Sequence, residues 1–138
     1  MKKLFQTNIN ITAANYLLLI LRISVGLFML THGMPKLMKL MQGNTSFADP
    51  LGLGETISLL LTLFAEVICS LFIILGLGTR LATIPLIITM SVAAFVANSD
   101  QPFAKKEMAL LYLLIYLCLL FLGSGSFSVD KAMSKGKR

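Results

Sequence analysis

Charged side chains are scarce in this chain of 138 residues, at 13% of the total against 57% hydrophobic residues. A soluble domain usually carries about 25% charged residues. So few polar groups could not cover a water-soluble globule, and we therefore expect one integral membrane domain. The net charge is +6. Because the basic residues lie mostly at the ends of apolar segments, they indicate contact with anionic lipid and exclude nucleic acid as the expected partner.

Cysteine and histidine are also rare. Cys69 and Cys118 lie inside apolar runs and form neither a CxxC motif nor another metal-ligand spacing. We interpret them as packing residues, with a thiol redox role as the alternative. His32 is the one histidine, so a histidine-rich metal site is excluded and no metal is expected. The glycine-rich triplets lie outside any strand–turn–helix context, which argues against a nucleotide site.

Long apolar segments dominate what is present, and they cover residues 16–34, 57–77, 80–98 and 107–122. A hydrocarbon core of about 30 Å needs about 20 helical residues. The first three segments meet this length and the fourth is slightly short. We expect an all-α fold, an integral membrane four-helix transmembrane bundle with antiparallel up-down topology. A soluble bundle is the rival interpretation, but the second segment has no polar face at helical spacing.

The segments between these helices predict the connections and the orientation. GLGTR predicts a tight helical hairpin, and Pro85 is expected in the first turn of the third helix. We divide the chain into a cytoplasmic tail (1–15), a four-helix membrane domain (16–131) and a basic cytoplasmic tail (132–138). Seven basic residues on the side of the termini against four on the other predict cytoplasmic termini. The apolar run after the first tail is too long for a signal peptide.

Ionisable residues inside a membrane span are costly and usually face the bundle interior. Arg22, His32 and Lys36 share one stripe of the first helix, and Glu66 lies within the second. Counted from the helix ends, Arg22 and Glu66 come within reach, so we predict that they form an ion pair. The pair is either a lock between two helices or a charged site for a ligand headgroup or a proton path.

A second polar cluster is expected at the outer membrane boundary. It comprises His32, Lys36, Asn98, Asp100 and Glu107. His32 is either a hydrogen-bonded packing residue or an acid–base group, and Lys36 either pairs with Glu107 or extends to the interface. Tyr112 and Tyr116 share a face of the fourth helix, where they pack or flank an aromatic ligand such as a quinone.

Three stretches of the chain, taken in order, resemble the DoxX family of small bacterial membrane proteins. They are LRISVGLFMLTHGMPKL, AEVICSLFIILGLGTRLA and EMALLYLLIYLCLLFLGSGSFSVD. The resemblance covers about residues 16 to 131. The motif positions are Arg22, Gly26, Gly33, Lys36, Glu66, Gly76, Arg80, Glu107, Gly123, Gly125, Ser128 and Asp130. Gly26 and Gly33 also permit close helix approach, and Ser128 or Asp130 is expected to cap a short last helix.

The resemblance implies a multi-pass protein of the bacterial inner (plasma) membrane. Family members are often called oxidoreductases, so an accessory or quinone-interacting subunit of a membrane redox complex is the expected function, with quinone as the candidate cofactor and redox proteins as partners. The sequence itself shows no catalytic motif, so whether it is an enzyme stays open. A small-solute or proton transporter, which would need to form a homo-oligomer, and a non-catalytic scaffold are the alternatives.

Overall fold

The computed structural model describes residues 8–135, and within them every regular element is helical. Residues 1–7 and 136–138 lie outside the described part, and with them four of the basic residues used to predict the orientation: Lys2, Lys3, Lys137 and Arg138. The elements are, in chain order, α1 (Ile11–Met41), α2 (Glu55–Leu63), the π-helical turn η2 (Phe64–Cys69), α3 (Ser70–Leu75), α4 (Thr79–Val92), the π-helical turn η3 (Ala93–Ala97), α5 (Phe103–Leu122) and α6 (Val129–Lys135).

Helix α1 is longer at both ends than the predicted segment 16–34. It begins at Ile11 because the side chain of Asn10 accepts hydrogen bonds from the amides of Thr12 and Ala13. At the other end it continues through Pro35, which lacks an N–H to donate within the helix. With 31 residues the helix is about 46 Å long, well beyond a hydrocarbon core of about 30 Å.

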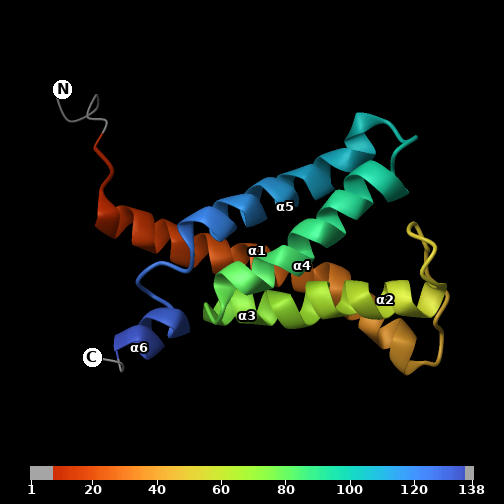
Figure 1. The fold of residues 1–138 in the computed structure, drawn as a ribbon, viewed down its shortest axis with the longest axis horizontal. Helices are drawn as coiled ribbons and strands as arrows, with labels where there is room; N and C mark the ends of the chain where they lie inside the picture. The colour runs from red at the N-terminus through yellow and green to blue at the C-terminus, as the bar shows by residue number, and fades with distance from the viewer. Residues whose placement is uncertain (1–7, 136–138) are drawn as a thin grey trace.

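The chain reverses direction between each long helical segment and the next (Figure 1). Helix α1 is paired with α3 and η2, and α4 is paired with α5. Figure 1 shows these two pairs crossing near the turn between α3 and α4 and diverging toward the loops that follow α1 and α4. The first and last described residues lie at the same end of the molecule, where α6 folds back beside α3.

The turn between α3 and α4 is tight, as GLGTR predicts. Gly76 and Gly78 have φ of 70° and 55°, left-handed values that glycine adopts without steric cost. Pro85 is not in the first turn of the helix that follows, because α4 already begins at Thr79 and Pro85 lies inside it. Its missing N–H leaves an acceptor in the preceding turn without a helical partner.

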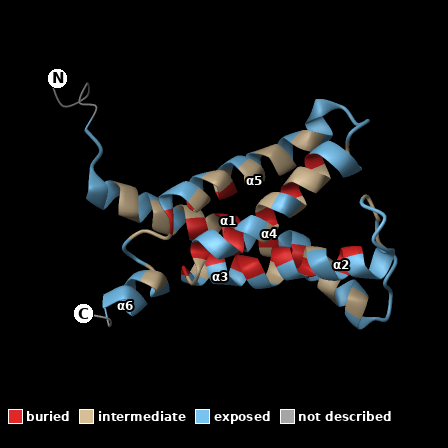
Figure 2. Ribbon diagram, in the orientation of Figure 1, coloured by how far each residue is buried: buried red, intermediate tan, exposed pale blue. Residues whose placement is uncertain are grey.

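Several polar side chains are buried in this molecule, and many large apolar side chains are exposed. Arg22, Ser58, Glu66, Ser70, Thr79 and Thr83 are buried, whereas Leu81 and Phe121 are each 75% exposed. Figure 2 shows the buried positions along the facing sides of α1, α3 and α4, with exposed positions on the outer sides. In water such an apolar surface would be unstable, so it matches a protein that is surrounded by lipid.

Three helical segments are long and apolar enough to cross a membrane: Ile11–Met41, Glu55–Leu75 and Thr79–Ala97. Helix α5 has 20 residues, but Lys105, Lys106 and Glu107 occupy its first turns and leave a shorter apolar stretch. The chain is therefore a helical membrane protein, and α5 is the segment on which the number of spans depends.

Candidate functional site

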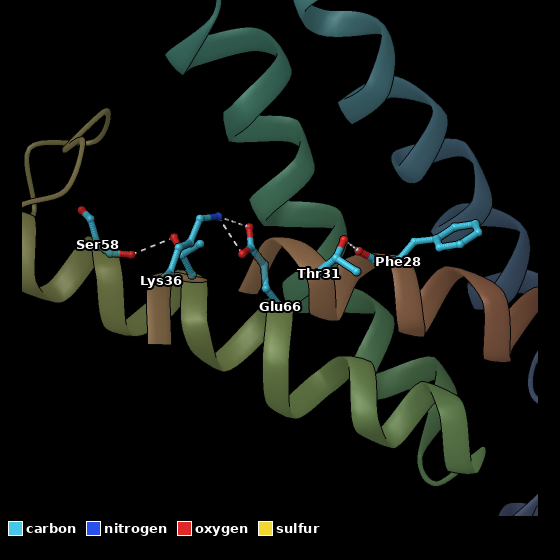
Figure 3. Close-up of polar contacts among 6 residues, drawn as sticks. Phe28, Thr31, Lys36, Ser58 and Glu66 are labelled. Carbon is cyan, nitrogen blue, oxygen red and sulfur yellow. Dashed lines mark hydrogen bonds and ion pairs between the residues drawn. The ribbon is translucent and has the colours of Figure 1, made fainter. Parts of the chain in front are cut away.

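Lys36 and Glu66 form the central ion pair of the described chain. The Lys36 ammonium donates to both carboxylate oxygens of Glu66, and each N–O distance is 2.6 Å. Figure 3 shows Lys36 reaching from α1 toward Glu66 on the neighbouring helix. The Glu66 side chain is 4% exposed and that of Lys36 is 30% exposed. Charge-assisted bonds to both oxygens satisfy a carboxylate that would otherwise be very costly to bury.

Close packing of α1 against η2 brings these two side chains together. A Cβ added to Gly33 would lie 2.8 Å from Cγ2 of Val67 and 3.1 Å from Cβ of Glu66, so the two backbones meet at this glycine. Gly26 makes the same kind of approach to Ile74. The predicted role of both glycines in close helix packing is confirmed. Lys36 lies one turn beyond Gly33 on the same face of α1, within reach of Glu66.

The π-helical turn η2 carries Glu66. Such turns insert an extra residue into a helix and are frequent at functional sites. A second one, η3, occurs where α4 approaches the same region. Both irregular turns contribute residues to one groove, Glu66 from the first and Ala93 and Ala97 from the second.

Two cavities share the ion pair as a common wall. The larger, of about 190 Å³, is a mostly apolar groove between α2, α4 and the loop that follows α1. Its apolar lining includes Phe47, Leu51, Leu61, Ile88 and Val92. The smaller, of about 100 Å³, is lined by Met29, His32, Lys36, Glu66, Met90, Met108 and Tyr112. One charged pair is thus accessible from an apolar side and from a more polar side.

Aromatic rings continue inward from the smaller cavity. The ring of His32 meets that of Tyr112 edge-on, with centroids 5.8 Å apart. Tyr112 in turn stacks with Tyr116 at a centroid distance of 6.1 Å, as their spacing on one helix face predicts. Tyr116 is fully buried, and its hydroxyl has no hydrogen-bond partner among the described residues. His32 itself is exposed, so it lies at the mouth of this row of rings.

The predicted pairing of Arg22 with Glu66 is wrong. Arg22 Nη2 donates instead to the carbonyl oxygen of Phe127, at 2.6 Å, and Glu66 is bound by Lys36. Arg22 lies 11 residues before Gly33, the position that faces Glu66, which is about 16 Å along the helix axis. No arginine side chain spans that distance. The prediction assumed that α1 begins at residue 16, whereas the helix begins at Ile11.

Arg22 belongs to a second cluster, at the end of the molecule where the termini lie. Its guanidinium is 1% exposed and contacts Gly76, where an added Cβ would overlap Nη1. Asp130 accepts from the amides of Gly78 at 2.7 Å and Thr79 at 3.2 Å, so its carboxylate caps the N-terminus of α4. The segment after α5 thus connects the buried arginine of α1 to the start of α4.

The other motif residues of this segment also have structural roles. The Ser128 hydroxyl accepts from the Lys131 amide and so caps α6, as predicted, whereas Asp130 caps a different helix. Gly125 lies against Asn15, and Asn15 accepts from the amide of Ser126. Gly123 lies against the guanidinium of Arg80, which donates to the carbonyl oxygen of Phe121.

The predicted outer cluster is assembled only in part. His32 and Lys36 share the smaller cavity with Glu66 and Tyr112. The side-chain amide of Asn98 donates to the carbonyl oxygen of Ala93, so Asn98 caps the C-terminal end of η3. Glu107 is exposed, and Lys36 pairs with Glu66 rather than with it. Within residues 8–135 no group of three or more His, Cys, Asp and Glu side chains converges.

The sequence indicates Met29 only as one residue of the inward stripe of the first helix, and it does not single out Met90, Met108 or the loop over the larger cavity. Met29, Met90 and Met108 come from three helices, and no spacing within one helix could have shown that they meet. Phe47 in the loop lies below the Lys36 ammonium, 5.7 Å from the nitrogen to the ring centroid. That contact holds the loop on the ion pair.

Comparisons with known proteins agree with the membrane fold. Residues 17–99 match the sequence model of the DoxX family. An uncharacterized protein of Haemophilus influenzae is 33% identical over 87% of the chain and 92% of its own length. An uncharacterized membrane protein of Mycobacterium tuberculosis is 31% identical over 83% of the chain and 80% of its own length. No solved structure matches the chain at the level of significance applied.

Proposed function

The chain belongs to the DoxX family of bacterial membrane proteins, and from that premise we propose that it is a four-span plasma-membrane protein that serves as a quinone-interacting, accessory subunit of a membrane redox complex. The single observation that carries the proposal is the Lys36–Glu66 pair at the wall between an apolar groove and a smaller cavity lined also by His32 and Tyr112.

Helix α5 is the fourth span in this proposal. Its charged residues, Lys105, Lys106 and Glu107, lie at its first turns, where they reach the interface while the remaining 108–122 stretch crosses the apolar core. Helix α5 packs antiparallel against α4, which belongs to a segment long and apolar enough to cross a membrane by itself. The two helices therefore lie at the same depth in the membrane. A helix shorter than the hydrocarbon core is accommodated by local thinning of the bilayer.

A quinone fits the two cavities because it has a polar ring and an apolar tail. The ring carbonyls accept hydrogen bonds, which the Lys36 ammonium supplies at the shared wall. The apolar groove lined by Leu51, Leu61 and Ile88 suits the isoprenoid tail. Since the chain shows no built-in electron carrier, the electrons for a bound quinone come from a partner protein.

Binding of a short-chain quinone to the purified protein tests this proposal. We expect saturable binding by the wild type and a loss of at least about tenfold in affinity for Lys36→Met, since the hydrogen-bond donor is removed. Lys39→Met is the matched control, because Lys39 is exposed one turn away and donates to the carbonyl oxygen of Ser46. Equal binding by both variants, or no binding by the wild type, contradicts the proposal.

A proton or small-solute permeation unit is the second candidate. Buried Glu66 and the unpartnered hydroxyls of Ser70, Tyr116 and Thr79 favour it, because such groups accommodate water inside a bundle. Proteoliposomes that show a flux abolished by Glu66→Gln and preserved in Glu55→Gln would support this candidate. Glu55 is exposed at the start of α2 and controls for the loss of a carboxylate.

A non-catalytic scaffold predicts a third result. If the ion pair only fixes the fold, the double variant Lys36→Met/Glu66→Leu retains both the partners that co-purify with the wild type in mild detergent and the cellular function. Loss of partner or quinone association in a folded double variant excludes the scaffold.

A further inference from the structure

Three methionine side chains meet at the smaller cavity, each from a different helix. Met29 comes from α1, Met90 from α4 and Met108 from α5. His32 lines the same cavity of about 100 Å³. Three thioether side chains and one imidazole side chain thus line a single space, together with Lys36 and Glu66.

Burial distinguishes two of these methionines from residues that merely face lipid. Met29 is 1% exposed and Met90 is 7% exposed, so both lie in the core between helices. Met108 is 56% exposed and His32 is also exposed, so these two lie toward the opening. The cavity therefore has two methionine side chains in the core, and Met108 and His32 lie at the opening through which an ion would enter.

We propose that this cavity is a binding site for copper(I), with Met29, Met90 and Met108 as thioether ligands and His32 as the imidazole ligand. Soft thioethers select Cu(I) over harder cations such as Mg²⁺ or Ca²⁺, which prefer oxygen ligands. The flexible side chain of methionine, with three rotatable bonds, lets the sulfurs converge on an ion. The prediction from the sequence that no metal binds considered only histidine and cysteine as ligands.

The nearby charges are compatible with a monovalent cation. The Lys36 ammonium is held by both oxygens of Glu66 at 2.6 Å, so the pair is neutral as a unit. The same contact occupies the carboxylate that a hard cation would need. The thioethers and the neutral imidazole carry no charge, so the occupied site would hold a single positive charge close to Glu66 and near the opening of the cavity.

Metal titration of the purified protein tests the site. Under anaerobic conditions with ascorbate, we expect the wild type to take one equivalent of Cu(I) from the chelator bicinchoninate. Met90→Leu and Met108→Leu should each weaken binding about tenfold or more, since each removes a sulfur ligand. Methionine-to-leucine changes conserve volume and usually cost less than about 1.5 kcal/mol, so the variants are expected to fold.

Two matched controls use methionines outside the cavity. Met38→Leu in α1 and Met133→Leu in α6 change exposed methionines that do not line it. Both should bind Cu(I) like the wild type. X-ray absorption of the copper-loaded protein should show sulfur and nitrogen neighbours, and the sulfur signal should fall in the double variant Met90→Leu/Met108→Leu.

Two results would overturn the proposal. One is a wild type that leaves all copper on the chelator; the other is a double variant that binds as tightly as the wild type, which would show that the metal is held elsewhere. Silver(I), which undergoes no redox change, gives the same readout by competition. The copper titration uses no quinone and the quinone assay uses no copper, so failure of one proposal is distinguishable from failure of the other.

Discussion

At the scale of single residues, the Glu66 carboxylate depends on one partner. It is 3% exposed and both of its oxygens are bound by Lys36. The cost of a buried charge rises steeply when its counter-charge is removed, whereas removing both charges together is often neutral. Comparing a variant that lacks one charge with a variant that lacks both therefore measures what the ion pair contributes to stability, separately from its function.

We therefore predict that Lys36→Met destabilises the folded protein by about 3–5 kcal/mol. Reversible unfolding in detergent measures the change. The double variant Lys36→Met/Glu66→Leu should recover most of the lost free energy, because no unpaired charge remains. The Lys39→Met control should stay within about 0.5 kcal/mol of the wild type. A single variant as stable as the wild type would show that the ion pair contributes nothing to the fold.

Gly33 is the second sensitive position. A Cβ there would lie 2.8 Å from Val67 and 3.1 Å from the Cβ of Glu66, closer than side chains pack. We predict that Gly33→Ala forces α1 away from η2 and costs about 1–3 kcal/mol. The same unfolding assay measures this, with Thr31→Ala on an exposed face of α1 as the control. Rescue of Gly33→Ala by Val67→Ala, which clears space for the methyl group, would confirm the contact; failure of the rescue would contradict it.

At the scale of elements, the segment after α5 acts as a connector. Phe127 accepts from Arg22, and Asp130 caps α4. Tyr16 and Phe127 also pack ring to ring, with centroids 4.9 Å apart. This short piece of chain thus links α1 to the turn between α3 and α4, in addition to the direct packing of the helices.

Asp130→Ala should weaken this connection. It removes the acceptor of two amides at the start of α4 and the nearest negative charge to Arg22, and we expect a loss of about 1–2 kcal/mol. Faster proteolysis of the segment after α5, followed by mass spectrometry of the fragments, measures it. Asp100→Ala in the exposed loop before α5 is the control. Equal cleavage of both variants would contradict the capping role.

The loop over the larger cavity contains an acid-sensitive contact. The Gly54 amide and the Ser58 hydroxyl donate to the Asp49 carboxylate at 2.8 Å, and the Leu53 amide donates to it at 2.9 Å. These bonds, above all that from Gly54, hold the pKa of Asp49 below its ordinary value of 3.8. Because the folded pKa is the lower one, the stabilisation is complete above the ordinary value and is lost as the pH falls through the lowered pKa.

We predict that the loop stays closed at pH values just above 3.8 and opens only at more acidic pH. Cleavage by an acid protease after Phe47 or Leu51 reports the opening. Asp49→Asn should give a loop that is cleaved at every pH tested, because the side-chain amide carries no charge to hold the three donors and does not titrate. Asp100→Asn should leave the cleavage profile unchanged, and a wild-type loop that is cleaved equally at all pH values would contradict the role of Asp49.

At the scale of the whole molecule, the proposal requires four spans and both termini in the cytoplasm. Labelling with a membrane-impermeant maleimide tests it, in a background with Cys69 and Cys118 replaced by alanine. We expect Ser46→Cys, in the loop after α1, to react in intact cells. Ser134→Cys, in α6, should react only after lysis. Both positions are exposed in the structure, so a reversed pattern would mean the opposite orientation.

Much of the molecule follows from the sequence alone. The scarcity of charge and the long apolar segments determine a helical membrane protein, and the stripe of Arg22, Val25 and Met29 identifies the inward face of α1. These features depend on composition and on helical periodicity, which are local. Gly26 and Gly33 also identify the face of α1 that packs closely, because the absence of a side chain lets the neighbouring helix approach at that position.

Only the tertiary structure decided which charges meet. In an antiparallel pair, residue numbers rise along one helix as they fall along the other. Gly26 contacts Ile74 and Gly33 contacts Val67. The same pairing places Arg22 opposite residue 78 and brings Lys36 near Glu66. That register is set by the close approach of the helices at the two glycines, and Lys36 lies on the same face because α1 continues through Pro35. The convergence of Met29, Met90 and Met108 likewise depends on how three helices pack, a long-range property that no local pattern carries.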